Sequence, residues 1–236
     1  MMANGYVLSP KSKSYHALDS FVYEYINCGG TKDNLKIEIN YMLRCHVLPV
    51  ARREVRLPWN EEKLTVFSVA PLEIFASKTV ALLTRTAPRD LYDMHNMVKF
   101  GLFDESEEAM LRKCVVFYSA IGSAQPPEKF ELNNIGNVSF RQIKRDLNSV
   151  LRKGERFDLE FVQKEVKDYL TSVLVPTKEE KLFWKAFSEG NYYPDWVFGD
   201  SDEFRNVAKH PMALWKCRDK EEDKKTLDKD HEKRVQ

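Results

Sequence analysis

The sequence has no long hydrophobic run, and this absence limits where the protein can act. No segment of its 236 residues approaches the roughly 20 consecutive apolar residues that a membrane-spanning helix needs. The opening stretch, MMANGYVLSPKSKSYHAL, also lacks the apolar core of a signal peptide. The sequence therefore predicts a cytoplasmic protein without a membrane partner.

Cysteine is scarce, and its spacing matches no common metal-binding pattern. The pattern favours free, mostly buried thiols in a reducing compartment. His46 and His95 have no partner at a metal-ligand spacing, so a packed or surface role is favoured for both over catalysis. The cysteines are widely separated and form no C-x-x-C pair: Cys28, Cys45, Cys114 and Cys217.

Charge of one sign is not in excess, with 37 Lys and Arg against 36 Asp and Glu. The chain lacks the overall basicity that would by itself indicate nucleic-acid binding. A local basic face is still compatible with this composition. It also lacks the Walker, GxGxxG, GxSxG and HExxH motifs. This excludes the commonest phosphate-binding, hydrolase and metalloprotease patterns.

The N-terminal part of the chain reads as two strands joined by a glycine turn. Residues 20–27, SFVYEYIN, are rich in β-branched and aromatic side chains, and LKIEINYML follows the CGGTKDN turn. Alternation in the second strand places Ile37, Ile39 and Tyr41 on one face, opposite a polar face. The polar face carries Lys36, Glu38 and Asn40.

Three arginines and a further strand come next. Arg52, Arg53 and Arg56 precede Pro58 in a predicted loop or short strand. Their guanidinium groups could bind phosphate oxygens. They could equally lie at a solvent-exposed edge without a ligand. Residues 63–69, KLTVFSV, predict another strand.

Two helices are predicted after this strand. Pro71 opens the first, which runs to about Arg85, and Pro88 opens the second, which ends near Gly101. Lys78, Arg85 and Arg89 would share one face if the helix ran on unbroken, but Pro88 favours a break there.

From residue 104 onward the pattern is helical. Ser106 is the expected cap of one helix, residues 138–151 form a second, Asp158 caps a third, and residues 179–188 form a fourth. The aromatic stretch NYYPDWVF (residues 191–198) fits either an anchor to the helical core or a base-stacking surface. After Trp215 the chain is almost entirely charged, which predicts a frayed helix or disorder.

These patterns predict an α+β protein: a small mixed β-sheet flanked by helices, followed by a helical C-terminal bundle. The expected divisions are residues 1–103, residues 104–216, and a charged tail over residues 217–236.

Two stretches, LKIEINYMLR (residues 35–44) and KTVALLTRTAPRDLYD (residues 78–93), resemble the AbiEii/AbiGii nucleotidyltransferase toxin family. The resemblance implies an enzyme that transfers a nucleotide from an NTP, with Mg²⁺, to an acceptor such as RNA, and that a cognate antitoxin neutralises. It also implies catalytic roles for Lys78, Asp90 and Glu38. Arg85, Arg89 and Asn40 are the expected substrate-binding residues.

The chain departs from the family pattern in one respect. The family's opening GSxxxxxDxD motif, which supplies metal-binding carboxylates, is not seen before Leu35, where Asp19 and Glu24 are not spaced as metal ligands. The metal ligands are therefore unknown. Two hypotheses follow: the chain is a fragment of an enzyme, or it is a catalytically silent relative that acts as a binding module.

The expected site residues also have ordinary structural explanations. Asp90 would lie in the first turn of a helix, where the helix dipole favours an acid. Arg89 and Asp93 are spaced to form a surface ion pair. Lys78 and Glu38 could each lie on a solvated face.

Overall fold

The structure is a computed structural model that describes residues 4–41, 43, 45–55 and 64–219. The chain forms two compact units, Met1–Arg44 and Cys45–Gln236. The expected boundary near residue 103 falls within the second unit and stays a prediction.

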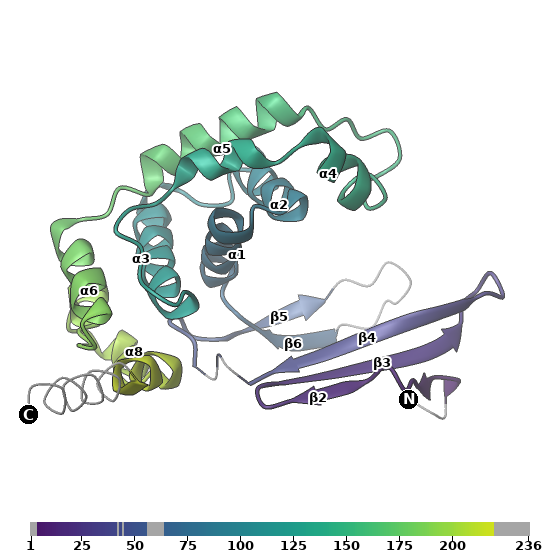
Figure 1. The fold of residues 1–236 in the computed structure, drawn as a ribbon, viewed down its shortest axis with the longest axis horizontal. Coiled ribbons are helices and arrows are strands. Elements are labelled where there is room, and N and C mark those ends of the chain that lie inside the picture. The colour runs from purple at the N-terminus through teal and green to yellow at the C-terminus, as the bar shows by residue number, and fades with distance from the viewer. Residues whose placement is uncertain (1–3, 42, 44, 56–63, 220–236) are drawn as a thin grey trace, which may run out of the picture. The chain divides into compact units, whose positions relative to one another are not determined.

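The first unit is an antiparallel sheet built around one long strand (Figure 1). This strand, β3 (Leu18–Ile26), pairs with β1 (Val7–Leu8), β2 (Lys13–Tyr15) and β4 (Lys32–Asn40). The expected strand, turn and strand are therefore present. In the turn, the Asn27 side chain accepts hydrogen bonds from the backbone N–H groups of Gly29 and Thr31, and Gly30 adopts a positive φ of 75°.

The register of β3 and β4 produces the expected alternation of faces. Ser20 lies opposite Glu38, and Val22 lies opposite Lys36. Because alternate residues of a strand face the same way, Lys36, Glu38 and Asn40 share one face and the intervening isoleucines share the other. The polar face thus agrees with the sequence.

The second unit begins with a hairpin and continues as helices. Strands β5 (Ala51–Val55) and β6 (Leu64–Ser68) pair with each other. Arg52 and Arg53 lie in β5, and the Arg52 guanidinium stacks over Phe67 with 5.2 Å to the ring centroid. Arg56 lies outside the described residues.

Helices α1 (Pro71–Arg85) and α2 (Pro88–Lys99) begin at the two prolines, as the sequence predicts. Gly101 follows α2 with a positive φ of 54°. Helix α3 (Glu105–Gly122) begins two residues earlier than expected, because Asp104 and not Ser106 is its cap. Asp104 accepts from the backbone of Ser106 and Glu107 and completes a capping box.

The remaining helices surround the core. They are α4 (Phe140–Asp146), α5 (Leu159–Val173), α6 (Lys178–Ser188), α7 (Asp195–Phe198), α8 (Arg205–Ala208) and a helix over residues 211–219, with 3-10 turns at Leu132–Asn137 and Asp202–Phe204. Asp158 caps α5, as expected. Helix α4 is shorter than the expected 138–151, because Ser139 caps it and the residues after Leu147 form turns.

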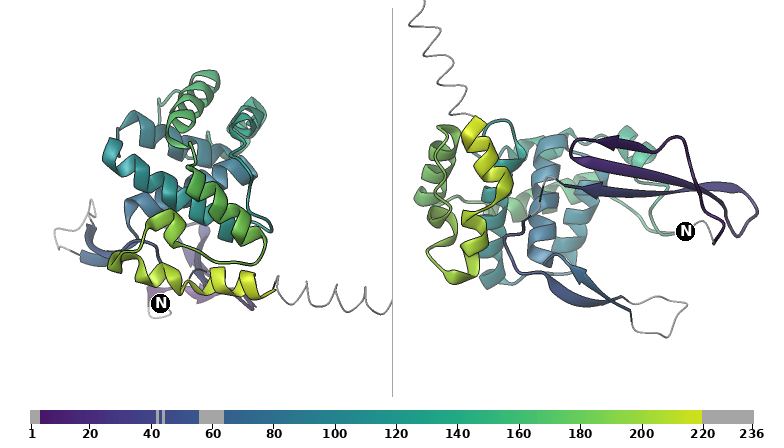
Figure 2. Two further views of the ribbon diagram at one scale, coloured as in Figure 1. Left: turned by 90° about the vertical axis from the view of Figure 1, so that its left-hand side faces the viewer. Right: turned by 90° about the horizontal axis from the view of Figure 1, so that it is seen from below.

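Helix α3 is the centre of the second unit. Residues 114–121 are buried on every side of it. It packs against α1 and α6, while α5 packs on α2 (Figures 1 and 2). Phe117 lies at the core, with ring centroids 5.7 Å from Phe198 and 6.4 Å from Phe183.

The α+β class is confirmed, but the sheets are not mixed. Every strand pairing among the described residues is antiparallel. Short turns join β2 to β3 and β3 to β4 as hairpins. Within the described ranges, no helix has the length and apolar character to cross a membrane.

Candidate functional site

Helices α1 and α2 begin with the same local pattern. Each has an alanine cap, a proline as first residue and an acid as third: Ala70-Pro71-Leu72-Glu73 and Ala87-Pro88-Arg89-Asp90. Neither alanine can cap its helix through a side chain. Both acids are buried, Glu73 with 1% and Asp90 with 3% of their surface exposed. A buried carboxylate requires hydrogen-bond donors, and each acid finds them outside its own helix.

Asp90 is held by Arg85 across the turn between the two helices. Arg85 Nε donates to Asp90 Oδ2 at 2.7 Å, and Nη2 donates to Oδ1 at 2.6 Å. This two-point contact suits the planar guanidinium group. The hydrogen bond from Arg85 to Asp90 raises the pKa of the arginine above its usual value.

A second ion pair joins the helices further from the turn. Lys78 Nζ lies 2.5 Å from Asp93 Oδ2, and both side chains are about one-third exposed, at 37% and 35%. Lys78 and Arg85 are seven residues apart in α1, which places them about 10 Å apart along one helix face. The helix pair therefore carries two cations, each fixed by a carboxylate.

Some of the expected site residues come together here and others do not. Lys78, Arg85 and Asp90 lie on this helix pair. Arg89 turns away from Asp93, and its Nε donates to the Asp146 carbonyl at 3.2 Å. The alternative expectation of an Arg89–Asp93 ion pair was therefore wrong.

Glu38 and Asn40 belong to the first unit. Glu38 forms an ion pair with Lys36 at 2.7 Å and is half exposed. Asn40 ends β4, opposite Leu18.

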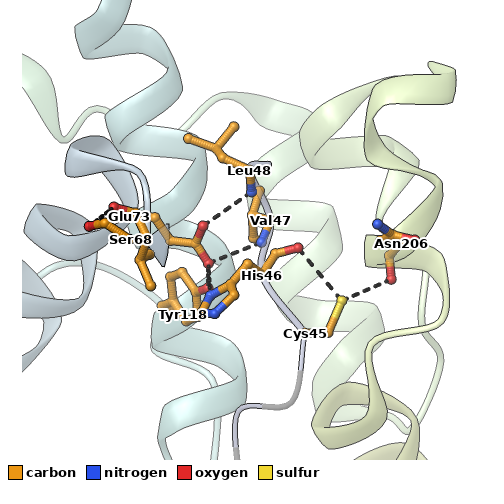
Figure 3. A network of polar contacts seen from close by, with 9 residues as sticks. Cys45, His46, Val47, Leu48, Ser68, Glu73, Tyr118 and Asn206 are labelled. Atoms are coloured by element: carbon orange, nitrogen blue, oxygen red, sulfur yellow. Dashed lines mark hydrogen bonds and ion pairs between the residues drawn. The ribbon is translucent and has the colours of Figure 1, made fainter. Parts of the chain in front are cut away.

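Glu73 forms a buried polar network that the sequence did not indicate (Figure 3). Its carboxylate accepts from the backbone N–H of Val47 at 3.0 Å and of Leu48 at 3.1 Å. His46 Nδ1 lies 3.1 Å from the same carboxylate, and the Tyr118 hydroxyl also donates to it. Burial, and then the bond to Glu73, raise the pKa of Tyr118 above its usual range. An acid two residues after a helix-opening proline was the available sequence signal, but it does not reveal the partners.

Cys45 and His210 lie beside this network. The Cys45 thiol contacts the Asn206 carbonyl at 3.5 Å (Figure 3). Burial, and then the charge of Glu73, raise the pKa of this thiol. His210 is fully buried, and neither of its ring nitrogens has a hydrogen-bond partner among the residues that the structure describes. Burial lowers the pKa of His210.

The other expectations for cysteine and histidine have mixed outcomes. All four cysteines are free, but Cys28 is exposed and Cys45 is half-buried. His95 Nδ1 lies 2.5 Å from Glu165.

The carboxylates in the described part of the chain do not form a magnesium site. Mg²⁺ takes carboxylate oxygens together with water and substrate phosphates. Both oxygens of Asp90 are occupied by Arg85, and Glu38 is paired with Lys36. Across residues 4–41, 43, 45–55 and 64–219, no group of three or more metal-binding side chains occurs. These residues, as arranged, do not fit a bound metal.

Comparison with protein families gives one clear result. Residues 9–182 match the family described as nucleotidyl transferase AbiEii toxin, type IV toxin–antitoxin system. The match extends beyond the two stretches in which the sequence shows the resemblance. It contains β3, β4 and the helix pair that bears Lys78, Arg85, Asp90 and Asp93.

Searches of curated proteins and of solved structures gave no significant match. The family match covers most of the chain, from the first unit to α6. The chain therefore belongs to the AbiEii nucleotidyl transferase toxin family of type IV toxin–antitoxin systems.

Proposed function

We propose that the protein transfers a nucleotide from an NTP to an RNA acceptor, acts in the cytoplasm and is neutralised by an antitoxin protein. The α1–α2 helix pair is its nucleotide site. The observation that carries this proposal is the pair of anchored cations, Lys78 and Arg85, on one helix face within the family match.

The chemistry of transfer requires positive charge near the reacting phosphates. An acceptor hydroxyl attacks the α-phosphorus, a new O–P bond forms, and the bond to the bridging oxygen breaks as pyrophosphate leaves. Negative charge builds on the phosphate oxygens and on the leaving group. In this proposal Lys78 and Arg85 stabilise that charge, and their ion pairs with Asp93 and Asp90 support it by holding both cations in position. Arg89 and Asn40 are proposed as further substrate contacts.

The roles of the acids are narrower than the resemblance alone implies. Asp90 orients Arg85 through two hydrogen bonds. Glu38 remains a proposed catalytic residue on the polar face of the sheet. Nucleotidyltransferases use a divalent metal, but no step can be assigned to one here, because the described carboxylates do not fit it.

The family uses a divalent metal, but the described carboxylates do not fit one, and this mismatch supports a second candidate function. A relative that binds nucleotides without transferring them would need the cations but not a metal site. The full occupation of Asp90 by Arg85 favours this binding module.

Replacing Lys78 with alanine tests the nucleotide site. We expect titration with each of the four NTPs in Mg²⁺ to show binding to the wild-type chain. Binding to Lys78→Ala should be about tenfold to 100-fold weaker, because a charged hydrogen bond to phosphate is lost. Isothermal titration calorimetry measures this difference.

The matched control is Lys164→Ala. Lys164 also pairs with an aspartate, Asp168, at 2.7 Å, but on the exposed face of α5. Its removal should leave binding unchanged. Equal binding by the wild type and Lys78→Ala would remove Lys78 from the site.

A further inference from the structure

One face of the sheet in the first unit contains a positively charged groove. The groove has a volume of about 680 Å³ and is open to solvent. Its walls carry Lys11, Lys13 and Lys36, and Glu38 is the one carboxylate among the described residues that line it. The groove is therefore basic, although the whole chain has a net charge of only +1.

The sheet register explains why these residues meet. Lys13 on β2 pairs with Ser20 on β3, and Ser20 pairs with Glu38 on β4. One step along, Val22 pairs with Lys36. Residues paired across an antiparallel sheet share a face, so lysines from β2 and β4 lie on opposite sides of β3. Two strand spacings separate these sides by about 10 Å.

Two of the three lysines are available to a ligand. Glu38 pairs with Lys36 at 2.7 Å. Lys11 and Lys13 are exposed and form no ion pair among the residues that the structure describes. Glu24 lies further along β3, outside the groove, and accepts a hydrogen bond from the Ser9 hydroxyl at 2.8 Å.

An aromatic ring completes the groove. Tyr15 lines it and is 55% exposed. Proteins that bind single-stranded nucleic acids combine a basic open groove, which follows the phosphates, with aromatic side chains on which bases stack. A sheet face is a common platform for this arrangement. Lys11, Lys13 and Tyr15 supply both elements on one face.

We propose that this groove binds the single-stranded part of the RNA acceptor. Lys11 and Lys13 contact consecutive phosphates, and Tyr15, two residues beyond Lys13 on the same face, stacks on a neighbouring base. The choice of RNA over other single strands rests on the proposed function. The presence of the groove depends only on the sheet of the first unit and not on the proposed function.

The test is the salt dependence of binding to a short fluorescent single-stranded RNA, followed by anisotropy. The full chain is compared with a Lys11→Ala/Lys13→Ala double variant. Each lost phosphate contact lowers the slope of log K against log salt concentration by about 0.7 for a single strand. The double variant should therefore show a slope smaller by about 1.4 and weaker binding at every salt concentration. Tyr15→Leu should weaken binding with little change in slope, since stacking releases no counterions.

Lys32→Ala is the matched control. Lys32 is exposed on the same face of β4 but lies outside the groove. It should bind RNA as the wild type does. An equal loss in Lys32→Ala, or no loss in the double variant, would overturn the proposal. So would displacement of the oligonucleotide by an equal concentration of a mononucleotide, which would indicate a single-nucleotide site.

Two further experiments distinguish the RNA-binding groove from the proposed nucleotide-transfer site. A DNA oligonucleotide of the same sequence shares the phosphates and bases, and its preference over RNA would overturn the assignment of RNA. Lys78→Ala should keep full RNA binding, and the double variant should keep full NTP binding. Loss of RNA binding in Lys78→Ala would contradict a separate groove.

Discussion

Replacing Glu73 with alanine is expected to lower the free energy of unfolding by about 3–5 kcal/mol, because the change removes the acceptor of a buried network. The backbone N–H groups of Val47 and Leu48 and the hydroxyl of Tyr118 would lose their partner, and Val47 and Tyr118 are buried. Urea unfolding of Glu73→Ala and wild type measures the loss directly.

Two further variants separate the network from a general effect of the substitution. Glu73→Gln keeps one acceptor oxygen and should lose less stability than Glu73→Ala. Glu160→Ala removes an exposed acid from the first turn of α5, where it is the second helical residue. It should change stability by less than about 1 kcal/mol. Similar losses in Glu73→Ala and Glu160→Ala would contradict the buried network.

Acid is expected to destabilise the second unit through His210. Burial lowers the pKa of His210 in the folded chain, while the unfolded chain titrates near its usual pKa of about 6.5. Below about pH 6.5, the unfolded state therefore binds a proton that the folded state does not. The free energy of unfolding falls as the pH falls through this window, by at most about 1.4 kcal/mol per pH unit. Above the window, His210 adds no pH dependence.

The comparison with His210→Phe isolates this contribution. Phenylalanine is apolar, can keep the edge contact with Phe117, whose centroid lies 5.2 Å from the His210 ring, and cannot take up a proton. His46 and His95, which face Glu73 and Glu165, are present in both proteins and cancel in the difference. Urea unfolding at a series of pH values should show a steeper acid loss in the wild type. Parallel pH profiles would show that His210 is not buried in its neutral form.

Local sequence signals predicted much of the fold. Pro71 and Pro88 set the starts of α1 and α2, and Asp158 caps α5, because these residues act on their own helix ends. The alternation of β4 likewise placed Glu38 and Asn40 on one face. Asp104 and Ser106 were both possible caps of α3. Asp104 is the cap, because its side chain accepts hydrogen bonds from the backbone N–H groups of Ser106 and Glu107.

The site could be predicted only in part, because its contacts join distant residues. The resemblance implied that Lys78, Arg85 and Asp90 belong to one site, and the structure adds the carboxylate that holds each cation. Glu73 was missed, since its partners lie about 25 residues before it and 45 residues after it in the sequence. The groove near Lys11 and Lys13 depends on strand register, which no local pattern specifies.

The central claim is that this family member transfers nucleotides at the α1–α2 pair, and label transfer tests it most directly. The wild-type chain, NTPs labelled at the α-phosphate, Mg²⁺ and total cellular RNA are incubated together, and the label in RNA is counted. We expect transfer by the wild type and by Lys164→Ala, and a loss of about 100-fold or more in Lys78→Ala. Wild-type protein that binds NTPs but leaves the RNA unlabelled would contradict the claim and identify the chain as a binding module.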